Sequence, residues 1–152
     1  MALMPFVPLV AGDRVLEPFA GENNFYDAFP TNVVKGWCEI RRGRDYKDCS
    51  GEWDWVITNP PYRLSEGTTR VNAFYQLLDY YSTRAKKGIA FLANDRCFST
   101  LTPRRLGILR QRGWSLHKVV VCSVKKWRGR YFFLVFRRED ANWFTHLPDT
   151  YE

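Results

Sequence analysis

The sequence predicts an α/β protein built on an open, Rossmann-like, mostly parallel sheet. Strand-like apolar runs alternate with helix-like segments along most of the 152 residues, and only a short basic segment separates the last two strand-like runs. Alternation of this kind is typical of parallel strands joined by crossovers. The short final connection instead favours a C-terminal hairpin, which places an antiparallel strand at the edge of the sheet.

The expected elements follow in chain order. Strands are predicted at residues 13–19, 33–39, 44–46, 53–58, 88–94, 116–123 and 130–137. Helices are predicted at residues 23–29, 69–86 and 102–112. The segment from Ile40 to Glu52 shows no helical apolar period, so we expect a loop with a short strand around Asp45 and Tyr46 in place of a crossover helix. The predicted fold is therefore a trimmed version of its class.

Length and composition fit a single domain. With 152 residues, of which 45% are hydrophobic and 16% aromatic, the chain can bury a sheet, and residues 140–152 are expected to form a peripheral tail. No apolar run approaches the roughly 20 residues of a membrane helix, and residues 1–10 lack the pattern of a signal peptide. We therefore expect a cytoplasmic protein without a membrane partner.

Cysteine and histidine positions give no support to a metal site. The four cysteines are widely separated, and the chain has only two histidines. This spacing fits neither a zinc cluster nor a disulfide framework, so reduced and mostly buried thiols are expected. The cysteines are Cys38, Cys49, Cys97 and Cys122.

The most informative segment is Asn59-Pro60-Pro61-Tyr62. It follows residues 53–58, a β-branched and aromatic run typical of a buried strand that two prolines stop. Proline pushes the preceding residue towards extended geometry and has no amide proton, so a short rigid elbow is expected. Such an elbow can hold a flat amine, although N-P-P alone could equally be a turn with a solvated asparagine.

A second motif lies upstream of the elbow. An apolar strand runs through a small-residue turn into a helix-like stretch, as in the first βα unit of nucleotide-binding folds, so the turn would lie under a ligand. The next strand-like run ends in an acidic residue, Glu39. The whole motif is Leu16-Glu17-Pro18-Phe19-Ala20-Gly21-Glu22-Asn23-Asn24-Phe25, preceded by Gly12-Asp13-Arg14-Val15.

Together, the order and spacing of LEPFAG, Glu39 and DWVITNPPY resemble the class I S-adenosylmethionine-dependent methyltransferases that modify exocyclic amines, above all the DNA adenine methyltransferases. The resemblance covers residues 5 to 138 and implies S-adenosylmethionine as the cofactor. One position departs from the family pattern, because Asn23 stands where a second glycine is usual. Asparagine tolerates positive φ better than most residues, so the turn is expected to survive.

The resemblance implies a role for the elbow. The Asn59 side-chain oxygen and the Pro60 carbonyl would accept hydrogen bonds from the target amine, Pro61 would complete the elbow, and Tyr62 would stack on the extruded base. These four residues are the expected catalytic set.

The resemblance also implies a cofactor site. Glu39 would bind the ribose hydroxyls, Ile40 would lie against the adenine ring, and Asp45 or Asp48 would bind the cofactor's exocyclic amine, with Asp45 preferred because Tyr46 follows it. Phe19, Ala20 and Gly21 would line the methionine moiety. The expected cofactor set is Glu17, Pro18, Phe19, Ala20, Gly21, Asn23, Glu39, Ile40, Asp45 and Tyr46.

Charge is unevenly distributed along the chain. Residues 1–40 contain two basic and five acidic residues, which gives a net charge of −3. The net charge of the whole chain is +7, so the other residues together carry a charge of +10. The basic residues gather in four clusters: Arg41-Arg42-Gly43-Arg44; Arg84, Lys86 and Lys87; Arg104, Arg105, Arg110 and Arg112; and Lys125-Lys126-Trp127-Arg128-Gly129-Arg130. Each cluster alone could be a solvated face, but their accumulation indicates a surface that follows a phosphate backbone. Trp127 could stack on a base or could be a core tryptophan. The expected substrate-binding residues are Trp127, Lys125, Lys126, Arg128, Arg41 and Arg42.

These observations favour methyl transfer to the exocyclic amine of adenine in DNA. No region is large enough for a separate target-recognition domain, so the sequence specificity is expected to be short or relaxed, or borrowed from a second subunit or a recognition partner.

RNA adenine or guanine methylation is the alternative, since the contacts that distinguish DNA from RNA leave no mark in the sequence. Protein glutamine methylation is a third possibility, but the basic surface argues against it, because a protein substrate would not need that surface. A degenerate, non-catalytic binding module also fits Asn23 and the missing crossover helix.

Overall fold

Six strands form one mixed sheet in the computed structural model, which describes residues 2–61, 64 and 70–138. The strand order is β2 (Val34–Trp37), β1 (Arg14–Glu17), β3 (Trp53–Thr58), β4 (Ala85–Asn94), β6 (Tyr131–Arg137) and β5 (Ser115–Cys122). The pairs from β2 to β4 are parallel, whereas β6 is antiparallel to both β4 and β5. The predicted fold class and its C-terminal hairpin are confirmed, but the antiparallel strand β6 lies between β4 and β5 and not at the edge of the sheet as expected.

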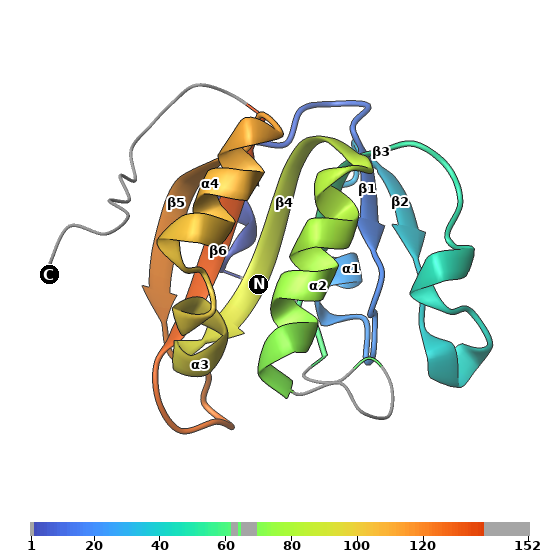
Figure 1. Ribbon diagram of the computed structural model, residues 1–152. Coiled ribbons are helices and arrows are strands. Elements are labelled where there is room, and N and C mark those ends of the chain that lie inside the picture. Colours follow the sequence, from blue (N-terminus) through green and yellow to red (C-terminus); the bar gives the residue numbers. More distant parts are fainter. Residues whose placement is uncertain (1, 62–63, 65–69, 139–152) are drawn as a thin grey trace, which may run out of the picture.

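Helices cover both faces of this sheet unequally. Helices α2 (Arg70–Ser82), α3 (Asp95–Ser99) and α4 (Pro103–Gln111) lie on the near face in Figure 1, and α1 (Asn24–Ala28) lies behind the sheet. Three short 3₁₀ helices complete the elements: η1 (Met4–Phe6), η2 (Ile40–Arg42) and η3 (Tyr46–Asp48). Both η2 and η3 lie beyond the β2 edge, where the chain passes from β2 to β3 (Figure 1).

Three local expectations differ from the structure. The predicted strand at 44–46 is absent, because the Asp45 side chain accepts a hydrogen bond from the Lys47 backbone and begins η3. Only an isolated bridge joins Glu39 to Arg44. Helix α3 was not expected; the Asn94 side chain caps it by accepting a hydrogen bond from Cys97 N. The helix predicted to run to residue 86 ends at Ser82, and β4 begins earlier than expected.

The core consists of two apolar layers, one on each face of the sheet. Successive residues of a strand point to opposite faces, so β4 and β6 contribute to both layers. Ile89 and Phe91 pack with α2 and α4, whereas Ala90 and Leu92 pack with α1 and the N-terminal segment. The uninterrupted apolar runs of β4 and β6 reflect this burial on both sides.

Two tryptophans of β3 occupy opposite layers although they are two residues apart. The pairing register with β4 shifts between Trp53 and Trp55, so Trp53 packs in the layer of α2 and Trp55 in the layer of α1. Each indole lies against a glycine of a neighbouring strand. A Cβ at Gly36 would lie 2.1 Å from the Trp53 ring, and one at Gly88 would lie 2.0 Å from the Trp55 ring. Glycine is required at both positions because the ring occupies the space of a side chain.

The expectation of reduced thiols is wrong for one cysteine pair. Cys38 and Cys49 form a disulfide with a Cα–Cα distance of 6.5 Å, whereas Cys97 and Cys122 are free. The pair meets because the segment that follows β2 folds back through η2 and η3. The disulfide therefore closes the loop that takes the place of a crossover helix.

Two predicted features lie outside the described residues: Tyr62 of the elbow and the tail at 140–152. Within the part of the chain that is described, no helix combines the length and the apolar character needed to cross a bilayer.

Candidate active site

A cavity of about 1200 Å³ opens at the carboxyl ends of the parallel strands. Its walls are the segments that follow β1, β2 and β3, together with the loop between β5 and β6. Ligands of open α/β sheets bind at this end of the strands, because the loops that leave them diverge there. The cavity therefore lies where the fold class predicts a ligand.

Glu17 forms the buried floor of the cavity at the end of β1. Its side chain is only 2% exposed, and Oε2 accepts a hydrogen bond of 2.6 Å from Tyr26 N at the start of α1. Burial disfavours the charged form and raises the pKa of Glu17 to about 8, although the Tyr26 hydrogen bond acts in the opposite direction. Glu17 is thus largely protonated at neutral pH.

Glu39 behaves in the opposite way at the end of β2. Its Oε1 accepts a hydrogen bond of 3.1 Å from Arg41 N, and its Oε2 accepts one of 2.7 Å from Gly21 N. The hydrogen bonds from these backbone N–H groups, that of Arg41 above all, lower the pKa of Glu39. The cavity therefore presents an ionised carboxylate beside the glycine turn.

Aromatic side chains form the wall next to Glu39. The rings of Phe19 and Tyr46 lie 5.2 Å apart between centroids, and Tyr46 also meets Tyr80 of α2 edge-on at 5.3 Å. Asp45 and Ile40 line the same end of the cavity, and Ile40 is 71% exposed. An exposed apolar side chain and two aromatic rings beside a carboxylate suit a nucleoside, which combines a flat base with ribose hydroxyls.

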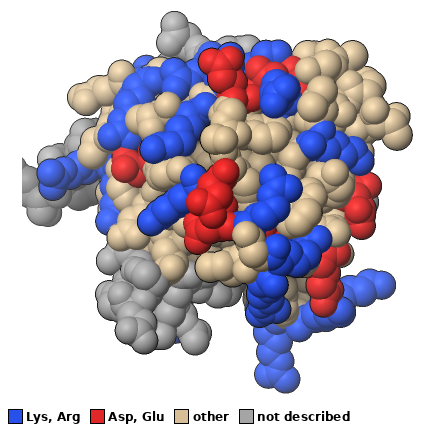
Figure 2. Space-filling model, turned by 90° about the vertical axis from the view of Figure 1, so that its right-hand side faces the viewer, with Lys and Arg blue, Asp and Glu red and all other residues tan. Residues whose placement is uncertain are grey.

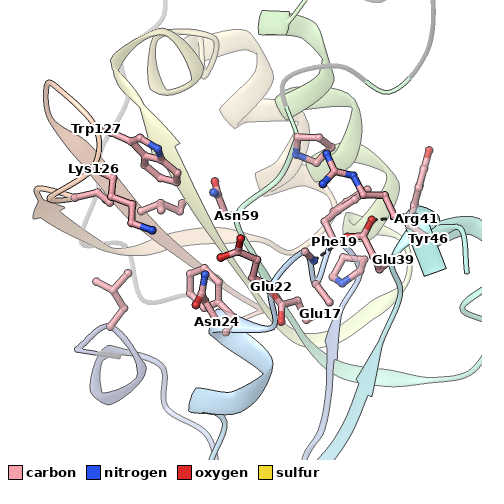
Figure 3. Close-up of a pocket in the computed structure, with 18 of the residues that line it drawn as sticks. Glu17, Phe19, Glu22, Asn24, Glu39, Arg41, Tyr46, Asn59, Lys126 and Trp127 are labelled. Atoms are coloured by element: carbon pink, nitrogen blue, oxygen red, sulfur yellow. Dashed lines mark hydrogen bonds between the residues drawn. The ribbon is translucent and has the colours of Figure 1, made fainter.

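Asn59 lies in the middle of the cavity. It directly follows β3, and Figure 3 shows its side-chain amide between the Glu39 end and the Trp127 end. Pro61 also lines the cavity, whereas Pro60 is buried behind it. The strand-then-proline pattern thus presents the asparagine at the junction of two subsites.

The loop between β5 and β6 forms the far end. Trp127 is 43% exposed, its ring lies 5.3 Å from that of Tyr131, and Lys125 and Lys126 line the cavity beside it. Figure 3 shows Lys126 and Trp127 on the opposite side of Asn59 from Tyr46. This end combines a flat aromatic surface with positive charge.

The structure brings most of the predicted site residues together. All of the expected cofactor residues line the cavity except Asn23, and of the expected substrate residues, Arg41, Lys125, Lys126 and Trp127 line it. Arg128 is not among the lining residues. Arg42 is also absent from the wall, because its guanidinium contacts the turn that holds Gly21 and Asn23.

Sequence reasoning missed part of the wall. Glu22 and Asn24 flank Asn23 and could have been included with the turn. No sequence signal indicated Leu3 or Leu92, since an apolar residue that lines a cavity looks like a core residue. The wall residues that were not anticipated are Ala2, Leu3, Glu22, Asn24, Phe25, Leu64, Leu92, Cys122, Ser123 and Val124.

Comparisons with known proteins identify the fold. No protein-family model matches the chain, and no curated protein matches its sequence. Among solved structures, the protein is similar to a methyltransferase from Pyrococcus furiosus, with a TM-score of 0.59 and 16% identity over 91% of this chain and 80% of the other.

Two further structures show the range of methyltransferases with this fold. The Mtq2–Trm112 complex of E. cuniculi, responsible for methylation of the eRF1 translation termination factor, has a TM-score of 0.54 and 13% identity over 86% of this chain and 87% of the other. The T. thermophilus 16S rRNA N2 G1207 methyltransferase RsmC, in complex with AdoMet and guanosine, has a TM-score of 0.53 and 14% identity over 97% of this chain and 40% of the other. The protein therefore has the fold of the S-adenosylmethionine-dependent methyltransferases.

Proposed function

We propose that this protein transfers a methyl group from S-adenosylmethionine to the exocyclic amine of adenine in DNA. The observation that carries the proposal is the position of Asn59, which lies in one cavity between a nucleoside-like subsite and a basic, aromatic mouth. The methyltransferase fold supports the reaction class, and the N-P-P-Y sequence of the elbow supports an amine as the acceptor.

The residues of the Glu39 end fit the cofactor. The ionised Glu39 can accept hydrogen bonds from ribose hydroxyls, and Asp45 can accept one from an exocyclic amine. Ile40, Phe19 and Tyr46 offer apolar surface to an adenine ring. Gly21 lines the cavity and has no side chain, so its backbone can lie directly against the methionine part.

The chemistry requires orientation more than acid–base catalysis. Bound S-adenosylmethionine supplies an electrophilic methyl group on a sulfonium sulfur. The Asn59 side-chain oxygen accepts a hydrogen bond from a target N–H group, which directs the nitrogen lone pair towards the cofactor end. No strong base is needed, because the methylated amine gives up its proton to solvent after transfer.

The Trp127 end suits a nucleic acid. The exposed indole can stack on a base, and Lys125 and Lys126 can contact phosphates. Elsewhere the basic surface is mixed: on the face formed by the β2 edge, Lys and Arg side chains surround a group of acidic ones (Figure 2). We therefore propose that the phosphate contacts lie mainly at the loop between β5 and β6. A second subunit or a recognition partner would contribute further to recognition of the nucleic acid.

Base methylation in RNA is the second candidate. It is favoured by the likeness to the rRNA methyltransferase, which acts on N2 of a guanine, also an exocyclic amine. Methylation of a protein, as in the E. cuniculi neighbour, would leave Lys125, Lys126 and Trp127 at the mouth without a role. A non-catalytic module would have no reason to keep Asn59 directed into the cavity.

Transfer of a tritiated methyl group tests the reaction. Duplex DNA, single-stranded DNA and RNA are compared as acceptors, and adenine in DNA should be labelled most. Asn59→Ala should abolish transfer and leave cofactor binding, measured by calorimetry, within about twofold. Asn32→Ala, which removes an exposed amide at the opposite end of β2, is the matched control and should stay active. Full activity of Asn59→Ala would refute the assignment of the elbow.

Salt dependence tests the polymer. Replacing Lys125, Lys126 and Arg128 by glutamine should flatten the dependence of DNA affinity on salt by about one unit of slope per lost phosphate contact. Preferential labelling of RNA would favour the second candidate. Salt-independent or absent binding to DNA and RNA would contradict both nucleic-acid proposals.

A further inference from the structure

Asn23 adopts a backbone conformation that normally favours glycine. Its φ of 66° and ψ of 20° lie in the left-handed region, and among the described residues it is the one non-glycine residue with a positive φ. Asparagine enters this region more readily than other side chains, but glycine does so without a steric penalty. The conformation matters because Asn23 joins the turn at Gly21 to helix α1 and so shapes the cofactor end of the cavity.

The Asn23 side chain does not stabilise this conformation in the usual way. Asn23 is the N-cap of α1, yet it makes no side-chain hydrogen bond to the first turn of the helix. Its Oδ1 instead accepts a hydrogen bond of 2.7 Å from Nη2 of Arg42, and the same nitrogen donates one of 3.1 Å to the carbonyl of Gly21. One guanidinium therefore spans the turn from Gly21 to Asn23.

Arg42 is itself held in place. Its guanidinium carbon lies 4.3 Å from the centroid of the Trp37 ring, at the end of β2. The N–H of Gly21 is bound by Glu39, which belongs to the same segment as Arg42. The segment after β2 thus holds both polar groups of Gly21, the N–H through Glu39 and the carbonyl through Arg42.

We propose that Arg42 is a positioning residue of the cofactor site: it holds the turn from Gly21 to Asn23 in its binding shape, in which the non-glycine residue Asn23 has a left-handed backbone conformation. The inference rests on the proposed cofactor site and assigns Arg42 a role in it that differs from a phosphate contact. Arg42 does not line the cavity, so it acts through the turn.

A double-mutant cycle on cofactor affinity tests the proposal. Arg42→Ala should weaken S-adenosylmethionine binding, measured by calorimetry, about tenfold. In the Asn23→Gly background the same change should cost less than about threefold, because glycine adopts the left-handed conformation without help. An equal loss in both backgrounds would overturn the proposal, since a purely structural or electrostatic role of Arg42 does not depend on residue 23.

Arg44 provides the matched control. Its guanidinium also stacks on the Trp37 ring, at 4.7 Å, and it carries the same charge, but within the described part of the chain it makes no hydrogen bond to the turn. Arg44→Ala should therefore change cofactor affinity less than about twofold. Steady-state kinetics adds a second readout: Arg42→Ala should raise the KM for the cofactor and leave kcat at saturation nearly unchanged. A loss confined to kcat, or an Arg44→Ala loss equal to that of Arg42→Ala, would contradict a role in positioning the turn.

The test stays informative if the unmutated protein binds no S-adenosylmethionine. That result would refute the proposed cofactor, whereas coupling between Arg42 and Asn23 can still be measured from urea unfolding of the ligand-free protein. The two substitutions should then be non-additive, with Arg42→Ala less destabilising in the Asn23→Gly background than in the wild type. Additive effects on unfolding would overturn the interaction itself.

Discussion

Glu17→Gln should remove a large pH dependence of stability. Burial raises the pKa of Glu17 to about 8 in the folded protein, from an ordinary value of 4.5. Between these two values the unfolded chain releases a proton that the folded protein keeps. The contribution of Glu17 to the free energy of unfolding should therefore be highest below pH 4.5, fall as the pH rises through this window, and reach its lower limit above pH 8.

The size of the effect follows from the two pKa values. Their difference, 8 minus 4.5, is about 3.5 units. At about 1.36 kcal/mol per unit, Glu17 alone removes about 5 kcal/mol of stability between acid and alkaline pH. This is comparable with the whole stability of a small domain, about 5–15 kcal/mol. Glutamine has nearly the same shape, stays neutral, and its oxygen can still accept the hydrogen bond from Tyr26 N.

Urea unfolding at several pH values between about 5 and 9 measures the effect. The free-energy difference between Glu17→Gln and wild type should grow steadily in favour of the variant up to about pH 8. Glu22→Gln removes an exposed carboxyl from the same turn and serves as the control, which should follow the wild-type profile. A difference that does not change with pH would refute the reasoning, because it would mean that Glu17 ionises alike in both states.

Three further predictions concern the mouth of the cavity, the core and the disulfide. Trp127→Ala should weaken single-stranded DNA binding by about 1–3 kcal/mol without altering the salt dependence of the affinity, because stacking releases no counterions. Fluorescence titration at several salt concentrations measures the affinity and its salt dependence, and a changed salt dependence would contradict the stacking role. Gly88→Ala should destabilise the protein by about 1–3 kcal/mol, since the new Cβ would lie 2.0 Å from the Trp55 ring. Urea unfolding measures the loss of stability, and an unchanged unfolding midpoint would show that the indole is free to move. Cys49→Ser should lower the free energy of unfolding by about 2–3 kcal/mol, as expected for a disulfide between residues 11 apart in sequence. A reductant should lower the stability of the wild type by a similar amount. If the wild type did not respond to the reductant, this would argue against the Cys38–Cys49 bond.

Local patterns were sufficient for the frame of the fold and the centre of the site. The run that ends at Thr58 and the two prolines after it predicted a strand whose end presents Asn59, and the structure has that strand and that position. The small-residue turn before Gly21 and the carboxylate of Glu39 were likewise found at the carboxyl ends of adjacent parallel strands. Such features depend on residues close in sequence, so periodicity and turn chemistry reveal them.

The path of the segment between β2 and β3 could not be predicted from the sequence. The absence of a crossover helix was predicted, but not η3 in place of a strand, nor the disulfide between Cys38 and Cys49. The path of this segment is set by the Asp45 cap and by the meeting of two cysteines, and neither produces a hydrophobic period. Spacing alone cannot pair cysteines, because pairing depends on how the intervening chain folds back.

The amino-acid sequence by itself determined the six strands of the sheet, although it also predicted a strand at 44–46 that is absent, and with them the residues at the carboxyl ends of β1, β2 and β3. Only the tertiary structure decided which distant side chains share the cavity, such as Leu3 and Leu92. It also decided that Arg42 binds Asn23 instead of standing free as part of a basic cluster. The physical reason is that strand ends follow from local propensity, whereas contacts between separate loops arise only when the packed sheet brings those loops together.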